Sequence, residues 1–115
     1  MLGEYLREQR ERLKVNDKSY SLRQVAQRVG IKPTYLSKIE REELPPPSEA
    51  TIKKLSQELD LDADILLAMA GKVSADLREI ICKRPQLFAE LIRQLKEVPD
   101  QAVLRVVREV TDGNW

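Results

Sequence analysis

Prolines and glycines mark where helices in this chain must begin or end, and their placement constrains the fold more than any other feature. Only four glycines and six prolines occur. Between them, apolar residues recur every three, four and seven positions, which is typical of amphipathic helices, and no stretch alternates as a strand would. The sequence therefore predicts an all-α protein, with helices over residues 2–14, 22–29, 33–41, 48–59, 62–70, 75–82, 85–97 and 100–111.

Two of these helices are joined by an unusually short connection. Ser21 is a suitable N-cap for the helix over 22–29, and Gly30 can adopt the left-handed conformation that ends it. Pro33 suits the first position of the following helix. A glycine-containing turn of about three residues between two short helices forces a crossing of about 90–120°, which is the geometry of a helix-turn-helix.

Basic charge is concentrated over the same two helices. Residues 21–41 contain five basic side chains and one acidic side chain, whereas the whole chain has a net charge of only +1. A basic unit that docks on a polyanion would show this pattern. An ordinary helical hairpin with a solvated basic face would show it equally well, so the residues alone leave both interpretations open.

Composition excludes several kinds of chemistry. The chain has no histidine and one cysteine, Cys82. A histidine-based catalytic triad, a histidine metal site and a multi-cysteine zinc site therefore cannot form, and we expect no enzyme activity, no metal and no cofactor. A lone cysteine suits a reducing cytoplasm. No apolar run approaches the roughly 18 residues that a membrane-spanning helix needs, so we expect no membrane partner.

Four short motifs resemble a known family. Leu-Arg-x-x-Arg at 6–10, Ser-Leu-Arg-Gln-Val-Ala at 21–26, Val-Gly-Ile at 29–31 and Tyr-Leu-Ser-Lys-Ile-Glu-Arg at 35–41 are similar to the xenobiotic-response-element family. These are lambda-repressor-like helix-turn-helix regulators of bacteria and phages. The resemblance covers residues 2–70 and implies a five-helix DNA-binding domain over residues 1–71, with double-stranded DNA as the partner. Two departures are a longer connection over 15–20, and Glu42 where the family most often has glycine.

The resemblance also implies roles for particular residues. It places Arg10 and Glu40 at positions that form a structural ion pair. Thr34 could instead help to cap its helix, and Tyr35 could instead pack against the first helix. The candidates for reading bases in the major groove are Lys32, Pro33, Thr34, Ser37 and Lys38, and those for the DNA backbone are Arg23, Gln24, Tyr35 and Arg41.

The longer connection before the second helix has its own expected role. It contains Lys18, and Lys14 lies just before it. The connection leads directly into the helix end that should rest on a phosphate. We therefore expect these lysines to add contacts to the DNA backbone.

The region over residues 72–115 is expected to form a helical dimerisation or partner-binding extension. Its apolar stripes exceed what a short DNA-binding domain needs for its own core, and operators are usually bound by paired units. The alternative is an appendage folded back on the first five helices. Cys82 follows two isoleucines and is predicted to be a buried small hydrophobe. The candidate dimerisation residues are Leu87, Leu91, Leu95, Val103, Val106 and Val110.

These observations together predict a sequence-specific transcriptional regulator. The preferred interpretation is a homodimeric repressor of a pseudo-palindromic operator. One alternative is an antitoxin of a toxin–antitoxin pair that represses its own operon through the same helix-turn-helix. Another is a protein-binding adaptor that keeps the fold without binding DNA. A toxin or a regulatory protease is a further possible partner.

Overall fold

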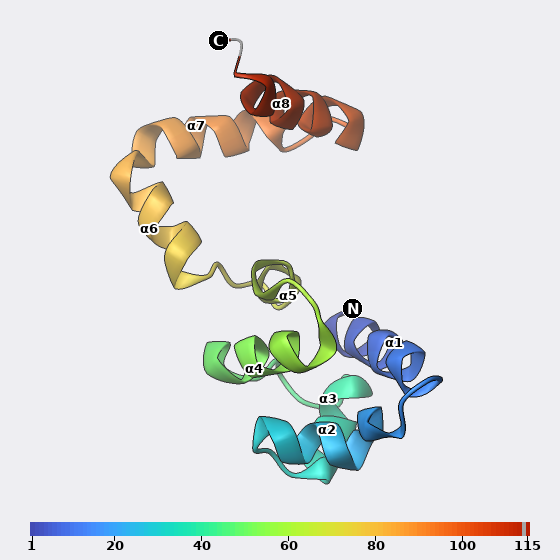
Figure 1. Cartoon of the computed structure of the whole chain (residues 1–115). Helices are drawn as coiled ribbons and strands as arrows, with labels where there is room; N and C mark the ends of the chain where they lie inside the picture. Colours follow the sequence, from blue (N-terminus) through green and yellow to red (C-terminus); the bar gives the residue numbers. More distant parts are fainter. Residues whose placement is uncertain (114) are drawn as a thin grey trace. The chain divides into compact units, whose positions relative to one another are not determined.

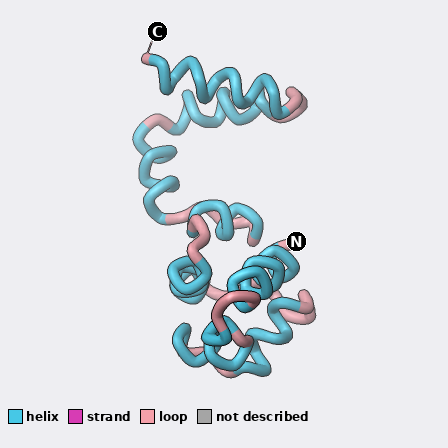
Figure 2. The backbone as a smooth tube through the Cα atoms, turned by 45° about the vertical axis from the view of Figure 1, so that its right-hand side comes forward, coloured by secondary structure: helices cyan, strands magenta, loops and turns pink. Residues whose placement is uncertain are grey.

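The structure is a computed structural model, and it describes residues 1–113 and 115. The described residues form helices and loops without any strand (Figures 1 and 2), which confirms the predicted all-α class. Five helices make up the N-terminal part of the chain. They are α1 (Leu2–Lys14), α2 (Leu22–Val29), α3 (Pro33–Glu40), α4 (Glu49–Leu59) and α5 (Ala63–Met69).

The local signals act where the sequence predicts them. The side chain of Ser21 accepts a hydrogen bond from the Gln24 amide at the start of α2, and Ser48 does the same for Thr51 at the start of α4. Gly30 ends α2 with a φ of 86°, in the left-handed region where glycine has no steric cost. α3 ends at Glu40, one residue earlier than predicted.

The predicted long connection between α1 and α2 contains an ordered element of its own. Residues Lys18–Tyr20 form a short 3-10 helix, η1. Asp17 caps it, because its carboxylate accepts a hydrogen bond from the Ser19 amide at 2.9 Å. The sequence pattern does not predict this element.

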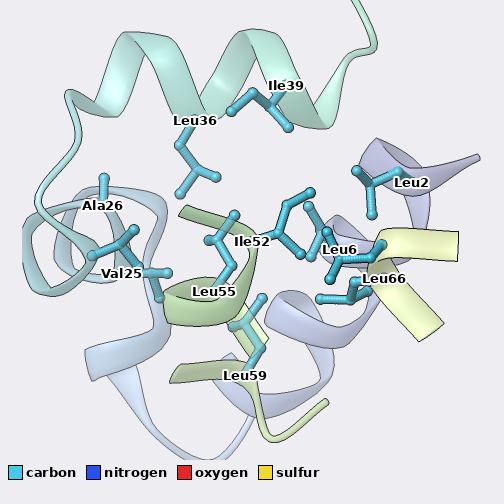
Figure 3. Packing of buried hydrophobic residues seen from close by; sticks show 12 residues of the cluster. Leu2, Leu6, Val25, Ala26, Leu36, Ile39, Ile52, Leu55, Leu59 and Leu66 are labelled. Carbon is cyan, nitrogen blue, oxygen red and sulfur yellow. The ribbon is translucent and has the colours of Figure 1, made fainter. Parts of the chain in front are cut away.

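A single apolar core joins the five N-terminal helices. In Figure 3 the side chains of Leu36 and Ile39, on α3, point toward α4. The inner face of α3 is therefore buried in the core, and only its outer face can contact a ligand. The buried apolar residues are Leu2, Leu6, Val25, Ala26, Val29, Leu36, Ile39, Ile52, Leu55, Leu59, Leu66 and Leu67.

The chain divides into two compact units, Met1–Leu77 and Arg78–Trp115. The first unit thus extends past α5 into the beginning of α6 (Ala75–Lys83). Ser74 is buried there, and the Ala75 amide donates to a carboxylate oxygen of Glu49 on α4. The division of roles at residue 71 remains a prediction.

The described residues of the second unit form no buried core. No residue of α6, α7 (Pro85–Leu95) or α8 (Asp100–Asp112) is buried. The prediction that Cys82 is buried is wrong: its side chain is exposed, as is that of Ile80. Many apolar side chains of these helices are therefore exposed to solvent. None of the helices in residues 1–113 is long and apolar enough to cross a membrane.

Candidate nucleic-acid interface

The sharp α2–α3 connection brings two helix ends to one surface. Only three residues separate Val29 from Pro33. The amides of Gly30 and Ile31 both donate to the Ala26 carbonyl, at 2.9 and 3.0 Å, and this closes α2 tightly. Pro33 then begins α3 at once, because its fixed φ already suits the first helical position. The two helices lie beside each other, with α1 and α4 packed against them (Figure 1).

The outer face of α3 presents uncommitted side chains. Lys32, Thr34 and Lys38 are exposed, and their side chains form no hydrogen bond or ion pair with the described residues. Thr34 therefore does not cap the helix. Pro33 is also exposed, whereas Ser37 is half-buried. Four of the five candidates for base contact are thus exposed, three of them on α3 and Lys32 at its N-cap, and they offer two ammonium groups and one hydroxyl as donors.

The candidates for phosphate contact differ in how free they are. Arg23 and Gln24 are exposed in the first turn of α2, where helix amides and the helix dipole favour an anion. The guanidinium of Arg41 pairs with the Glu43 carboxylate at 3.1 Å. Tyr35 is half-buried against the apolar core, in line with the alternative that it packs rather than binds.

A buried ion pair fixes the end of α3 to α1. Arg10 donates from Nε and Nη2 to the two carboxylate oxygens of Glu40, at 2.7 and 2.9 Å. The two residues are 4% and 6% exposed. The hydrogen bond that Arg10 donates to the Glu40 carboxylate raises the pKa of the Arg10 guanidinium above its ordinary value. Glu40 is therefore occupied within the fold, although it lies on the recognition helix.

Arg28 has a role that sequence reasoning missed. It contributes to the basic charge of residues 21–41, yet it donates to the Ser19 carbonyl at 2.7 Å and to the Glu58 carboxylate at 2.6 Å. Its guanidinium also lies 5.4 Å from the centre of the Tyr20 ring. Because Arg41 is paired as well, three of the five basic residues within 21–41 have no partner among the residues that the structure describes, namely Arg23, Lys32 and Lys38.

Arg7 is a further basic residue that sequence reasoning did not select. It is exposed and lines a hollow of about 170 Å³ between α1, α2 and α3, together with Ser37 and Arg41. Its place in the motif over residues 6–10 was the only sequence signal that could have found it. The hollow borders the outer face of α3.

The candidate dimerisation residues lie on α7 and α8. Leu87 and Val110 are 69% and 62% exposed, Leu91 and Val106 are exposed to a lesser degree, and Leu95 and Val103 are half-buried. Within the described ranges, no group of three or more histidine, cysteine or acidic side chains is placed to hold a metal ion.

The fold and this exposed basic surface define a DNA-binding protein of the helix-turn-helix class. A family model described as Helix-turn-helix matches residues 6–66, which is more than half of the chain. The chain therefore belongs to this helix-turn-helix family, of the Cro/C1 type, and is a lambda-repressor-like DNA-binding transcriptional regulator. The family is generally non-enzymatic. No curated protein and no solved structure is similar enough to match the chain.

Proposed function

We propose that this protein is a homodimeric, sequence-specific repressor of the xenobiotic-response-element subfamily, acting in the cytoplasm on a pseudo-palindromic operator. One observation carries the proposal: α3 is held rigidly from inside by the core and by Glu40, while its outer face offers free donor groups. Bound dimers would repress by occluding the promoter.

Base recognition is assigned to the outer face of α3 and to Lys32, which directly precedes it. Lys38 can donate to O6 and N7 of a guanine in the major groove. Thr34 can donate or accept a hydrogen bond, or place its methyl group against a thymine. Pro33 can make only apolar contact, and Lys32 and Ser37 lie beside these residues. A recognition helix of eight residues can read only a few base pairs in this way.

Contacts to the DNA backbone are assigned to the beginning of α2, to Tyr35 on α3 and to Arg41 at the end of α3. Arg23 and Gln24 lie at the beginning of α2 and would approach a phosphate there. Arg41 would have to exchange Glu43 for a phosphate, and both side chains are half exposed, so this exchange costs little. Tyr35 would contribute its hydroxyl from a ring packed on the core.

Dimerisation is assigned to α7 and α8. Apolar side chains that a single copy leaves open support this assignment, because large exposed apolar patches mark interfaces. Two half-sites bound by one dimer would lie about one helical turn of DNA apart, roughly 34–36 Å. A second copy covers the same patches in both partners at once, as a two-fold interface requires.

Selection of bound sequences from a random DNA pool by the intact protein tests this function. We expect one enriched motif that contains two inverted half-sites. An enriched single half-site would contradict the dimeric operator. If no motif is enriched and the protein does not bind heparin in a salt-sensitive way, the protein-binding adaptor would be favoured. A small partner that co-purifies stoichiometrically with the chain would favour the antitoxin.

A further inference from the structure

We propose that Arg28 is a positioning residue for DNA binding. It fixes η1 at the entry to α2 and so holds Lys18 where it contacts the DNA backbone. This inference rests on the proposed function and deepens it, because it assigns a pre-positioned phosphate contact to the connection between α1 and α2. It also removes Arg28 itself from the set of side chains that meet DNA.

Two arginines hold consecutive carbonyl groups of η1. Arg28 reaches from α2 to the Ser19 carbonyl at 2.7 Å. Arg10 reaches from α1 to the Tyr20 carbonyl at 3.3 Å. The Tyr20 ring lies under the Arg28 guanidinium as well. A surface connection of this kind is ordinarily mobile, whereas hydrogen bonds from two arginines hold the backbone of this one in place.

The same two arginines are themselves anchored. The other end of the Arg28 fork binds Glu58 on α4, and the other side of Arg10 binds both oxygens of Glu40 on α3. Through these two arginines, η1 is therefore linked to α3, the helix proposed to read bases, and to α4. A contact made from a segment already held in place loses less conformational entropy on binding than one made from a free loop.

Lys18 is the side chain that this arrangement presents. It is exposed, and its ammonium group has no partner among the residues that the structure describes. It lies three positions before Ser21, the cap of the α2 end expected at a phosphate.

The only acidic residue within positions 14–23 is Asp17, against three basic ones. Hydrogen bonds from Ser19 lower the pKa of Asp17 below its ordinary value, and its carboxylate is occupied in capping η1. The segment therefore offers an anion a net positive charge, with Lys18 as its free donor.

The test uses the intact protein and the DNA motif that the pool selection yields, and it measures dissociation constants over a range of salt concentrations. The variants are Lys18→Gln, Arg28→Lys and the two combined. Lys96→Gln, which removes one exposed charge at the end of α7, is the matched control. Arg28→Lys keeps the positive charge but cannot span Ser19 and Glu58 with one planar fork.

We expect Lys18→Gln to lower the slope of log affinity against log salt by about one, as loss of one phosphate contact does, without changing the selected motif. Arg28→Lys should weaken binding, and in its presence Lys18→Gln should have little further effect. Lys96→Gln should change neither quantity. Thermal unfolding of each variant shows that it is folded at the binding temperature.

Three results would overturn the inference. An unchanged salt slope in Lys18→Gln would show that η1 makes no phosphate contact. Full retention of affinity in Arg28→Lys, or independent effects of the two substitutions, would show that Arg28 does not act through Lys18. Absence of any sequence-specific binding by the unsubstituted protein would instead reject the proposed function itself.

Discussion

Arg10 shows how one residue can link several parts of this fold. It is buried and charged, and its donors serve Glu40, Glu11 and the Tyr20 carbonyl. No buried side-chain polar atom in residues 1–113 lacks a partner, so the cost of burying the charge is offset only while all these bonds persist. Its loss would disturb both the recognition helix and η1.

Breaking the Arg10–Glu40 pair from one side should be strongly destabilising. We expect Glu40→Gln to lower the free energy of unfolding by about 3–5 kcal/mol, because it leaves the guanidinium buried without its counter-charge. The apolar double substitution Arg10→Met with Glu40→Leu should recover much of this loss. Urea denaturation measures both. A double variant no more stable than Glu40→Gln would contradict this account of the pair.

Substitutions of base-reading residues and of backbone-contacting residues should affect DNA affinity and sequence preference differently. We expect Lys38→Ala to weaken binding to the selected motif by about 1–3 kcal/mol and to relax preference at one base pair. Arg23→Ala should instead weaken all sequences alike and lower the salt slope by about one. Repeated pool selection with each variant distinguishes the two. An unchanged motif for Lys38→Ala would show that the assigned register of α3 is wrong.

At the scale of the elements, the beginning of α1 lies against the end of α3. A Cβ atom at Gly3 would lie 2.2 Å from the Ile39 carbonyl oxygen and 2.9 Å from that of Glu40. Both neighbours are backbone atoms and cannot rotate away. Gly3 is therefore required by close packing of two helices, although alanine is the better helix former.

Replacement of this glycine should reverse the usual preference. We expect Gly3→Ala to destabilise the protein by about 1–3 kcal/mol, as overpacking does. Glu8→Ala, on the exposed side of the same helix, is the control and should change stability by less than about 0.5 kcal/mol. Urea denaturation of the two variants decides the matter, and a stabilising Gly3→Ala would disprove the close contact.

Two helix ends use a non-glycine residue in the left-handed region. Glu42 has a φ of 59° after α3, and Asp60 has a φ of 55° after α4. This conformation costs an ordinary residue roughly 1–2 kcal/mol. We expect Glu42→Gly and Asp60→Gly each to stabilise the fold by up to about 1 kcal/mol.

The two substitutions should differ in DNA binding. Glu42 places a negative charge at the end of the recognition helix, where its carboxylate pairs with the amino group of Met1 at the surface. Glu42→Gly should therefore tighten binding as well as raise the melting temperature. Asp60→Gly, the matched control, should raise the melting temperature alone. Equal affinities for both would show that the Glu42 charge lies too far from DNA to matter.

At the scale of the whole molecule, the two compact units differ in kind. The first encloses an apolar core, while the helices of the second bury no residue. A fragment ending at Leu77 keeps Ser74 and the bond from Ala75 to Glu49, and it should unfold cooperatively by itself. It should sediment as a monomer and bind the complete operator far more weakly than the intact chain, which should sediment as a dimer.

A charge placed on the apolar face of α7 tests the interface directly. Leu91→Glu should convert the intact chain to a monomer in sedimentation, because a buried carboxylate without a partner is costly. Gln101→Glu adds the same charge at an exposed polar position of α8 and should leave the dimer intact. A monomeric unsubstituted chain would favour the alternative in which the second unit folds back on the first.

Interactions between near neighbours could be read from the sequence. Ser21 and Ser48 each cap a helix by accepting a hydrogen bond from the amide three residues later, and Gly30 ends a helix by its own backbone conformation. The apolar residues on one face of a helix follow one another at intervals of three or four positions, so the pattern is visible within a short stretch of sequence. For this reason the all-α class, the helix-turn-helix and, to within one residue, the bounds of most helices followed from the sequence alone.

Tertiary structure alone decided which charged residues stay free to bind. Arg28 and Arg23 look equivalent in the sequence, but Arg28 contacts partners 9 and 30 positions away, whereas Arg23 has no partner among the described residues. In the same way, only packing shows that Gly3 touches α3, that η1 is fastened, and that Cys82 is exposed. Contacts between distant positions depend on how the helices are stacked, and the periodicity of a single helix carries no information about that.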